Sequence, residues 1–136
     1  MSMYLSRGQF GNARARYQDV DVGSRIEGAT PHQLVAVMFE ELLKSLDAMA
    51  VAVQRRDLLR RGRCQSRALA ILKGLENSLD FENGGDIAEG LASIYREATR
   101  LILAGGRTND PATVAAAREM VGEIASAWDA IGAKAA

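Results

Sequence analysis

Residues that carry metal and covalent chemistry are nearly absent from this chain of 136 residues. His32 is the single histidine and Cys64 the single cysteine, so a zinc site would lack enough ligands of the usual kinds. A nucleophilic thiol would need Cys64 beside His32, yet Cys64 falls on an apolar stripe, where a buried thiol is the more common role. The Glu-x-x-His pairs that di-iron helical bundles require do not occur. We therefore expect no enzyme activity and neither a metal nor another cofactor.

Proline and strand-forming segments are also scarce. Pro31 and Pro111 are the two prolines, and the long stretches around them are rich in alanine, leucine, arginine and glutamate, which favour helices. Runs of Val, Ile, Thr and aromatic residues, which are typical of strands, are missing. Because 48% of the residues are hydrophobic, the chain has enough apolar material for one folded domain. The composition predicts an all-α protein.

Long apolar runs are missing as well. No run approaches the ~20 residues that a membrane span needs, and residues 1–17 lack the apolar centre of a secretory signal. The single cysteine agrees with a reducing compartment. We therefore expect a cytoplasmic protein that does not bind a membrane.

The charge of the chain is balanced in total but unevenly placed. The formal net charge is zero, so the chain as a whole lacks the positive charge that indicates nucleic-acid binding. From Arg55 to Arg67, however, six arginines accompany one acid, Asp57. We interpret this stretch as a solvated helix start. Binding of nucleic acid is the alternative, and it is disfavoured because no aromatic residue lies between the arginines to stack on bases.

Four segments combine helix start signals with helical spacing of apolar residues. Thr30 is a natural N-cap, Pro31 suits the first helical position, and Gln33 completes a capping box. This first helix should end near residue 54, and a second should run from about 57 to 79. A third should begin at residue 86, where an aspartate is followed three residues later by a glutamate, and a fourth at residues 109–111.

The apolar residues of these segments recur three or four positions apart, which predicts one buried face on each helix. The predicted faces are Val35, Met38, Leu42, Leu46, Met49 and Val53, then Cys64, Ala68, Ile71, Leu72, Leu75 and Leu79, then Ile87, Leu91, Ile94, Ala98 and Leu101, and finally Val114, Ala117, Val121, Ile124, Trp128 and Ile131. Short connections between helices of similar length predict an antiparallel, up-down-up-down four-helix bundle over residues 30–136. Residues 1–29 should form a mobile, glycine-containing N-terminal segment.

Two adjacent glycines, Gly84 and Gly85, could belong either to a phosphate-binding loop or to a corner between two helices. Such a loop needs a strand before it and a helix after it, whereas a helical segment precedes these glycines and no strand is expected. We therefore predict that the two glycines form the corner between the second and third helices, with Asp86 capping the third.

Several runs together resemble one known family along nearly the whole chain. These runs are ATPHQLVAVMFEE at residues 29–41, LDFENGGDIAEGLASIY at residues 79–95, TND at residues 108–110, and Ala127 with Trp128. In order and spacing they resemble the flagellin export chaperones of the FliS family. Two departures stand out: Glu41 replaces a common glycine, and Gly105 with Gly106 replaces an Ala-Asn pair that we place in a loop.

The resemblance implies a function and partners. Members of this family are small cytosolic bundles that bind the disordered C-terminal segment of flagellin, prevent its premature polymerisation and deliver it to the flagellar type III export apparatus. The bound tail is largely helical and wraps around the bundle in apolar grooves. No cofactor, nucleotide, nucleic acid or membrane is implied.

Apolar stripes wider than a four-helix core requires indicate the residues that serve a partner. Our candidates for flagellin binding are Leu72, Leu75, Leu79, Leu91, Ile94 and Tyr95. Tyr17 lies where the family carries an aromatic residue, and we expect it to anchor the N-terminal segment as a lid over part of the groove. The alternative function is a helical regulatory or scaffold module that self-associates through the same apolar surface. Weak self-association of the free protein is compatible with either function.

Overall fold

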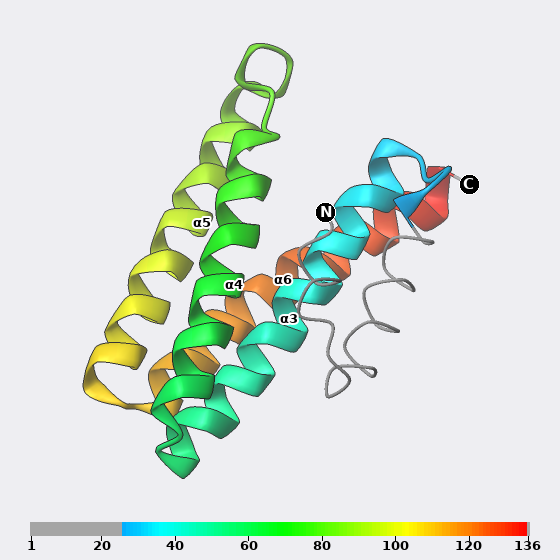
Figure 1. Ribbon diagram of the computed structural model, residues 1–136. Helices are drawn as coiled ribbons and strands as arrows, with labels where there is room; N and C mark the ends of the chain where they lie inside the picture. Colours follow the sequence, from blue (N-terminus) through cyan, green and yellow to red (C-terminus); the bar gives the residue numbers. More distant parts are fainter. Residues whose placement is uncertain (1–25, 136) are drawn as a thin grey trace. The chain divides into compact units, whose positions relative to one another are not determined.

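The computed structural model describes residues 26–135 and contains four helices and no strand within that range (Figure 1). The helices are α3 (Pro31–Arg55), α4 (Leu58–Asn77), α5 (Phe81–Thr108) and α6 (Pro111–Ala135). The all-α prediction is confirmed. Two compact units divide the chain, Met1–Val37 and Met38–Ala136. Tyr17 and the lid expected of the N-terminal segment lie outside the described residues.

The start of α3 follows the predicted capping box. The backbone amide of Gln33 donates to Thr30 Oγ1 at 3.1 Å, and the backbone amide of Thr30 donates to Gln33 Oε1 at 2.9 Å. Both groups would otherwise be among the unsatisfied amides of a helix start. Pro31 occupies the first helical position, where its missing N–H carries no penalty.

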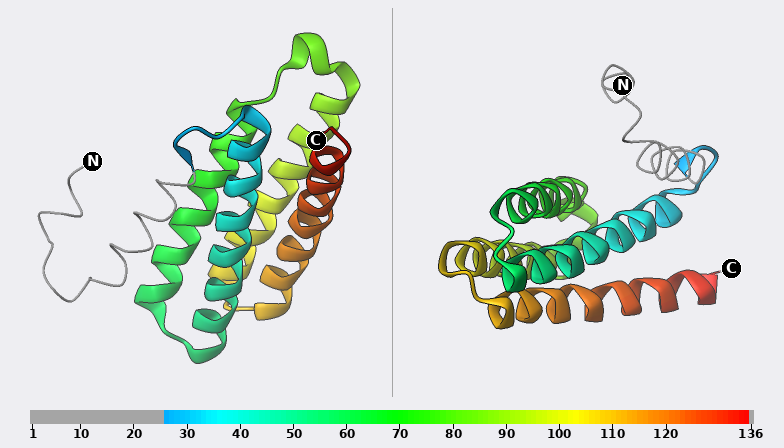
Figure 2. Two further views of the ribbon diagram at one scale, coloured as in Figure 1. Left: turned by 90° about the vertical axis from the view of Figure 1, so that its right-hand side faces the viewer. Right: turned by 60° about the horizontal axis from the view of Figure 1, so that its bottom comes forward.

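Contacts between helices of the second unit define a four-helix bundle. Three ion pairs join neighbouring helices: Arg67 with Glu41, Arg118 with Asp47, and Arg96 with Glu76. They link α3 to α4, α3 to α6, and α4 to α5, while α5 packs against α6 where Gly105 meets Val114. Each helix therefore has its sequence neighbours beside it, and the short corners make these neighbours antiparallel (Figure 2). This is the predicted up-down-up-down order.

The core of this unit is made largely of the predicted positions. The buried residues on α3, α4 and α6 include Leu42, Leu46, Met49, Val53, Ala68, Leu72, Leu75, Val114, Ala117 and Val121. Their three- and four-residue spacing places them on one face of each helix, so the apolar faces meet in the interior. On α6 the predicted stripe extends too far, because Ile131 is exposed.

The predicted buried face of α5 is wrong by about one residue. Ile87 is 76% exposed, and Leu91, Ile94 and Leu101 are only half-buried. Ala98 is buried as predicted, and the other buried residues are Ala88, Ala92, Tyr95, Ile102, Gly105 and Gly106. Small residues on this face let α5 approach its neighbours closely, so shape complementarity outweighs side-chain size. A prediction that selects the largest aliphatic residues misses such a face.

The corner between α4 and α5 also differs from the prediction. The Asp80 carboxylate accepts hydrogen bonds from the backbone amides of Glu82 and Asn83, at 3.1 and 3.0 Å, and thereby caps α5. The bond from the Asn83 amide, followed by that from its side chain, lowers the pKa of Asp80. The chain thus turns at residues 78–80, and Gly85 (φ 49°, ψ −126°) forms a kink inside α5. Gly85 has the predicted positive φ and separates the first turn of α5 from the rest, so the longer part of the helix follows this kink, near the predicted start at Asp86. The prediction missed the turn before it, which Asp80 caps six residues earlier.

The two departures from the family pattern have structural roles. Glu41 accepts a hydrogen bond from Arg67 at 3.0 Å and joins α3 to α4 at that point. Gly105 and Gly106 are not in a loop, as expected, but are buried in the last turns of α5. A Cβ atom at Gly106 would meet Gln65 Oε1 of α4. Glycine therefore permits close contact between helices at this position.

Replacing Gly85 and Gly90 by alanine should change stability in opposite directions. Gly85 has positive φ, so Gly85→Ala should destabilise the protein by about 1–2 kcal/mol, although nothing lies within 4 Å of the new Cβ atom. Gly90 is helical with the same open surroundings, so Gly90→Ala should stabilise by roughly 0.5–1 kcal/mol. Urea unfolding of both variants measures the difference. Equal effects would contradict a strained backbone at Gly85.

Candidate binding surface

The described residues contain no cluster of the usual metal ligands. Between residues 26 and 135 no three His, Cys, Asp or Glu side chains lie close enough together to hold a metal ion. Cys64 is a free, half-buried thiol on α4. None of the described helices is both long and apolar enough to cross a membrane. Surfaces that could bind another chain are the remaining candidates among residues 26–135.

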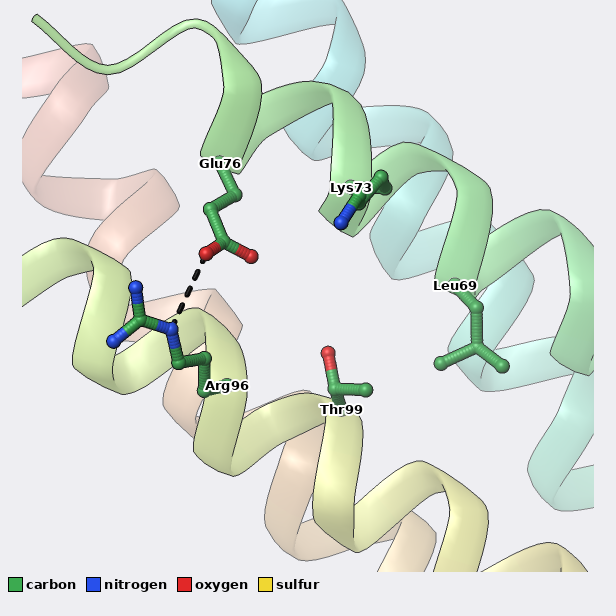
Figure 3. Close-up of a pocket in the computed structure, with 5 residues that line it drawn as sticks. All are labelled: Leu69, Lys73, Glu76, Arg96 and Thr99. Atoms are coloured by element: carbon green, nitrogen blue, oxygen red, sulfur yellow. Dashed lines mark hydrogen bonds and ion pairs between the residues drawn. The ribbon is translucent and has the colours of Figure 1, made fainter.

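A depression of ≈ 320 Å³ lies on the outer side of α4 and α5 (Figure 3). Its lining residues are Leu69, Lys73 and Glu76 from α4, and Arg96 and Thr99 from α5. Arg96 Nε donates to Glu76 Oε2 at 3.2 Å, which closes one end of the depression with an ion pair. The Thr99 hydroxyl donates to the Tyr95 carbonyl at 2.8 Å, so its hydrogen is already used within the helix.

An apolar pair extends this depression toward the C-terminal end of α5. Arg96 of α5 pairs with Glu76 of α4. Two residues before the end of α5, a Cβ atom at Gly106 would meet Gln65 of α4. Between these two contacts the antiparallel register places Leu69 opposite Leu103. Leu103 is 43% exposed and Leu69 is half-buried. We call the depression together with Leu69 and Leu103 the α4–α5 groove.

The opposite edge of α5 carries a second apolar strip. Gly105 contacts Val114 of α6, whereas its neighbour Gly106 contacts α4, so the two edges of α5 can be told apart. Leu91, Ile94, Ala98 and Leu101 precede Gly105 at helical spacing and share its edge, as does the exposed Ile87. We call Ile87, Leu91, Ile94 and Leu101 the α6-side strip.

The predicted binding residues therefore fall into three groups. Leu72, Leu75 and Tyr95 are buried in the interior and do not line an open groove in this conformation. Leu91 and Ile94 lie in the α6-side strip, and Leu79 is half-buried in the short connection that follows α4. Tyr17 is outside the described residues. Whether any of these side chains contacts flagellin stays a prediction.

Sequence reasoning missed Leu103. Leu103 shares its edge of α5 with Arg96 and Thr99, which precede it at helical spacing. In the sequence this edge therefore reads as a polar helix face that contains a single leucine. Nothing in that pattern distinguishes a binding groove from a solvated surface. The available signal was the leucine itself, one helical turn from Thr99.

Burial raises the pKa of the Tyr95 phenol, so the folded protein favours its neutral form. In the unfolded chain the phenol has a pKa of about 10, and below that pH the neutral group contributes its full stabilisation to the fold. This contribution is lost as the pH rises through the higher pKa of the folded state. We expect the free energy of unfolding to fall above about pH 10. Tyr95→Phe should flatten this fall in urea unfolding at several alkaline pH values. An unchanged slope in the variant would contradict the assignment to Tyr95.

Comparison with known proteins identifies relatives of this chain. The sequence model of the family described as "Flagellar protein FliS" matches residues 13–135. A flagellar secretion chaperone FliS of Salmonella typhimurium is 32% identical over 120 residues, which cover 88% of this chain and 89% of the relative. Its counterpart from Vibrio cholerae is 32% identical over 85% of each chain, and a FliSB of Pseudomonas aeruginosa is 27% identical over 88% of this chain and 94% of the relative.

Proposed function

Because this chain belongs to the FliS family of flagellar proteins, we propose that it is a cytoplasmic export chaperone specific for flagellin. It binds the disordered C-terminal segment of flagellin, prevents polymerisation before export, and hands the client to the flagellar export apparatus. The names of the relatives, flagellar secretion chaperones, support this role.

The observation that carries the proposal is the α4–α5 groove. An amphipathic helix can lay its apolar face along two antiparallel helices when their outer sides leave room for its side chains. Leu69 and Leu103 supply the apolar floor, and the depression beside them gives space for a side chain of the client. Lys73, Glu76 and Arg96 surround that space with charges of both signs, which suits the polar flanks of a helix.

A second contact region would let the client wrap around the bundle. The α6-side strip lies on the other edge of α5 and includes Ile87, the most exposed of the large apolar residues in the described chain. A helical tail that bends around α5 would cover both regions. Contact with two separate apolar regions raises affinity through effective concentration, even if each region alone binds weakly.

Titration calorimetry tests the proposal. The full chain is titrated with the C-terminal segment of the flagellin from the same organism, and with an N-terminal flagellin segment as control. We expect saturable binding of the C-terminal segment with a negative heat-capacity change, the signature of apolar burial and coupled folding. In parallel, the protein should delay polymerisation of purified flagellin at equimolar ratio. Equal binding of both segments, or no delay, would contradict a flagellin-specific chaperone.

A further inference from the structure

One end of the bundle combines exposed leucines with unpaired arginines. The α3–α4 and α5–α6 corners meet there (lower part of Figure 1). Leu58 is 62% exposed and Leu59 is 68% exposed at the start of α4. Five exposed arginines accompany them: Arg55, Arg56, Arg60, Arg63 and Arg107. We call these seven residues the basic end.

The guanidinium groups of the basic end are available to a partner. Among residues 26–135 none of the five arginines forms an ion pair, whereas Arg67, Arg96, Arg100 and Arg118 each do. The surface is also held firmly. Asn109 Nδ2 donates to the Val53 carbonyl at 3.2 Å, and Arg61 donates to the Gly106 carbonyl at 3.0 Å, so hydrogen bonds tie the two corners together.

The other end of α4 has the complementary character. Around the α4–α5 corner, Phe81 is 47% exposed and Ile87 is 76% exposed. The exposed acids Glu82, Asp86 and Glu89 stand among them, and none forms an ion pair with a described residue. We call these five residues the acidic end.

We propose that the basic end of one molecule binds the acidic end of a second copy of this chain. Each end offers two large apolar side chains. Five exposed arginines outnumber the exposed Asp57 at the basic end, and exposed acids surround the apolar pair at the acidic end, so the two ends carry opposite net charge. The 20-residue helix α4 separates the ends by about 30 Å, so they cannot meet within one molecule. Contact between two copies pairs the free arginines with the free carboxylates and covers all four apolar side chains.

The chemistry of the basic end favours this occupant over nucleic acid. The stretch from residue 54 to residue 67 contains no aromatic residue on which a base could stack. Its exposed leucines, in contrast, need an apolar counterpart, which phosphate groups do not provide and the acidic end does. The contact joins different surfaces of the two copies, and when the copies stack end to end it builds open head-to-tail chains rather than a closed dimer. A surface as small as a bundle end gives weak, reversible association.

Sedimentation velocity of the full chain over a range of concentrations tests the proposal. The average sedimentation coefficient should rise with concentration without a plateau at dimer. Raising NaCl from about 50 mM to about 500 mM should weaken the association by about tenfold or more, since exposed charges are screened. The double variant Arg60→Glu/Arg63→Glu should remain monomeric, as should Glu82→Arg/Glu89→Arg. An equimolar mixture of the two variants should associate, because one then carries two acidic ends and the other two basic ends.

Two controls separate this contact from general electrostatics. Lys73→Glu and the double variant Glu119→Arg/Glu123→Arg reverse exposed charges away from both ends, and they should associate like the parent. Circular dichroism checks that every variant is folded. A monomeric parent, a salt-independent closed dimer, or a variant mixture that fails to associate would each overturn the proposal. Salt-dependent binding of a short DNA duplex by a monomeric parent, lost in Arg60→Glu/Arg63→Glu, would assign the basic end to nucleic acid instead.

Flagellin binding is a separate question with a separate outcome. The acidic end shares Ile87 with the α6-side strip, so the basic-end variant is the one that separates the two questions. Arg60→Glu/Arg63→Glu leaves Leu69, Leu103 and the α6-side strip unchanged, and calorimetry of this variant with the flagellin segment measures client binding independently of association. If head-to-tail association fails, sedimentation shows a monomer while calorimetry still shows flagellin binding. If flagellin binding fails, calorimetry shows no binding while sedimentation still shows association.

Discussion

Replacing Leu103 by aspartate should weaken binding of the flagellin C-terminal segment by about tenfold or more, which corresponds to about 1.4 kcal/mol. The wild-type leucine is 43% exposed, so a helix in the α4–α5 groove would bury most of the area that remains open. An aspartate at the same place would lose its water without gaining a partner. Because the side chain already points to solvent, the fold itself should tolerate the change. Titration calorimetry gives the affinity, and thermal unfolding reports on the fold.

Two matched substitutions show where the client lies. Leu59→Asp makes the same change at an exposed leucine of the basic end, outside both proposed client regions, and should leave the affinity unchanged. Ile87→Asp reports on the α6-side strip and should weaken binding if the tail wraps around α5. Full affinity in Leu103→Asp together with a loss in Ile87→Asp would move the site to the α6-side strip.

Replacing Gly105 by valine should destabilise the protein by about 1–3 kcal/mol through overpacking. A Cβ atom at this position would lie 2.7 Å from Val114 Cγ2, 3.3 Å from the Val114 amide nitrogen and 3.4 Å from the Asp110 carbonyl oxygen. Two of these atoms belong to the backbone at the start of α6, which cannot move without shifting the helix. Valine is also a modest helix former, so little helix propensity is gained in return. Urea unfolding at neutral pH measures the loss.

A double-mutant cycle with Val114→Ala separates steric conflict from other causes. Val114→Ala alone destabilises because it leaves a cavity in the core. In combination with Gly105→Val, the missing methyl groups make room for the new side chain. The double variant should therefore be more stable than the sum of the single losses predicts. Additive losses would show that the two positions do not conflict. Gly62→Val is the control, since nothing lies within 4 Å of a Cβ atom at Gly62.

The helix boundaries were largely predictable because they depend on local chemistry. The capping box at Thr30, the proline at residue 111 and the aspartate before it act within a few residues of themselves. The first turn of α5, before the kink at Gly85, was missed because Asp80 caps it six residues before the predicted start at Asp86. Only the hydrogen bonds from Glu82 and Asn83 to Asp80 reveal that turn.

The buried face of α5 was not predictable in the same way. Which face of a helix is buried depends on the shape of its neighbours, and the small residues Ala88, Ala92 and Gly105 are buried where Ile94 and Leu101 were expected. The groove depends on the same information. Leu103 becomes a candidate only when α4 lies beside α5 and brings Leu69 opposite to it. Such relations join residues far apart in the sequence and leave no periodic signal.

The difference between the two ends of the bundle sets where the structure opens most readily. At the end with residues 53–61 and 105–111, hydrogen bonds connect one corner to the other, so neither corner unfolds alone. At the α4–α5 corner the hydrogen bonds of Ser78 and Asp80 are all local. The kink at Gly85 further isolates the first turn of α5 from the rest of that helix. We therefore expect local unfolding to begin at this corner and to cost less free energy than global unfolding. The expected unfolding unit is residues 78–86, with the remainder of α5 keeping its packing when that unit opens.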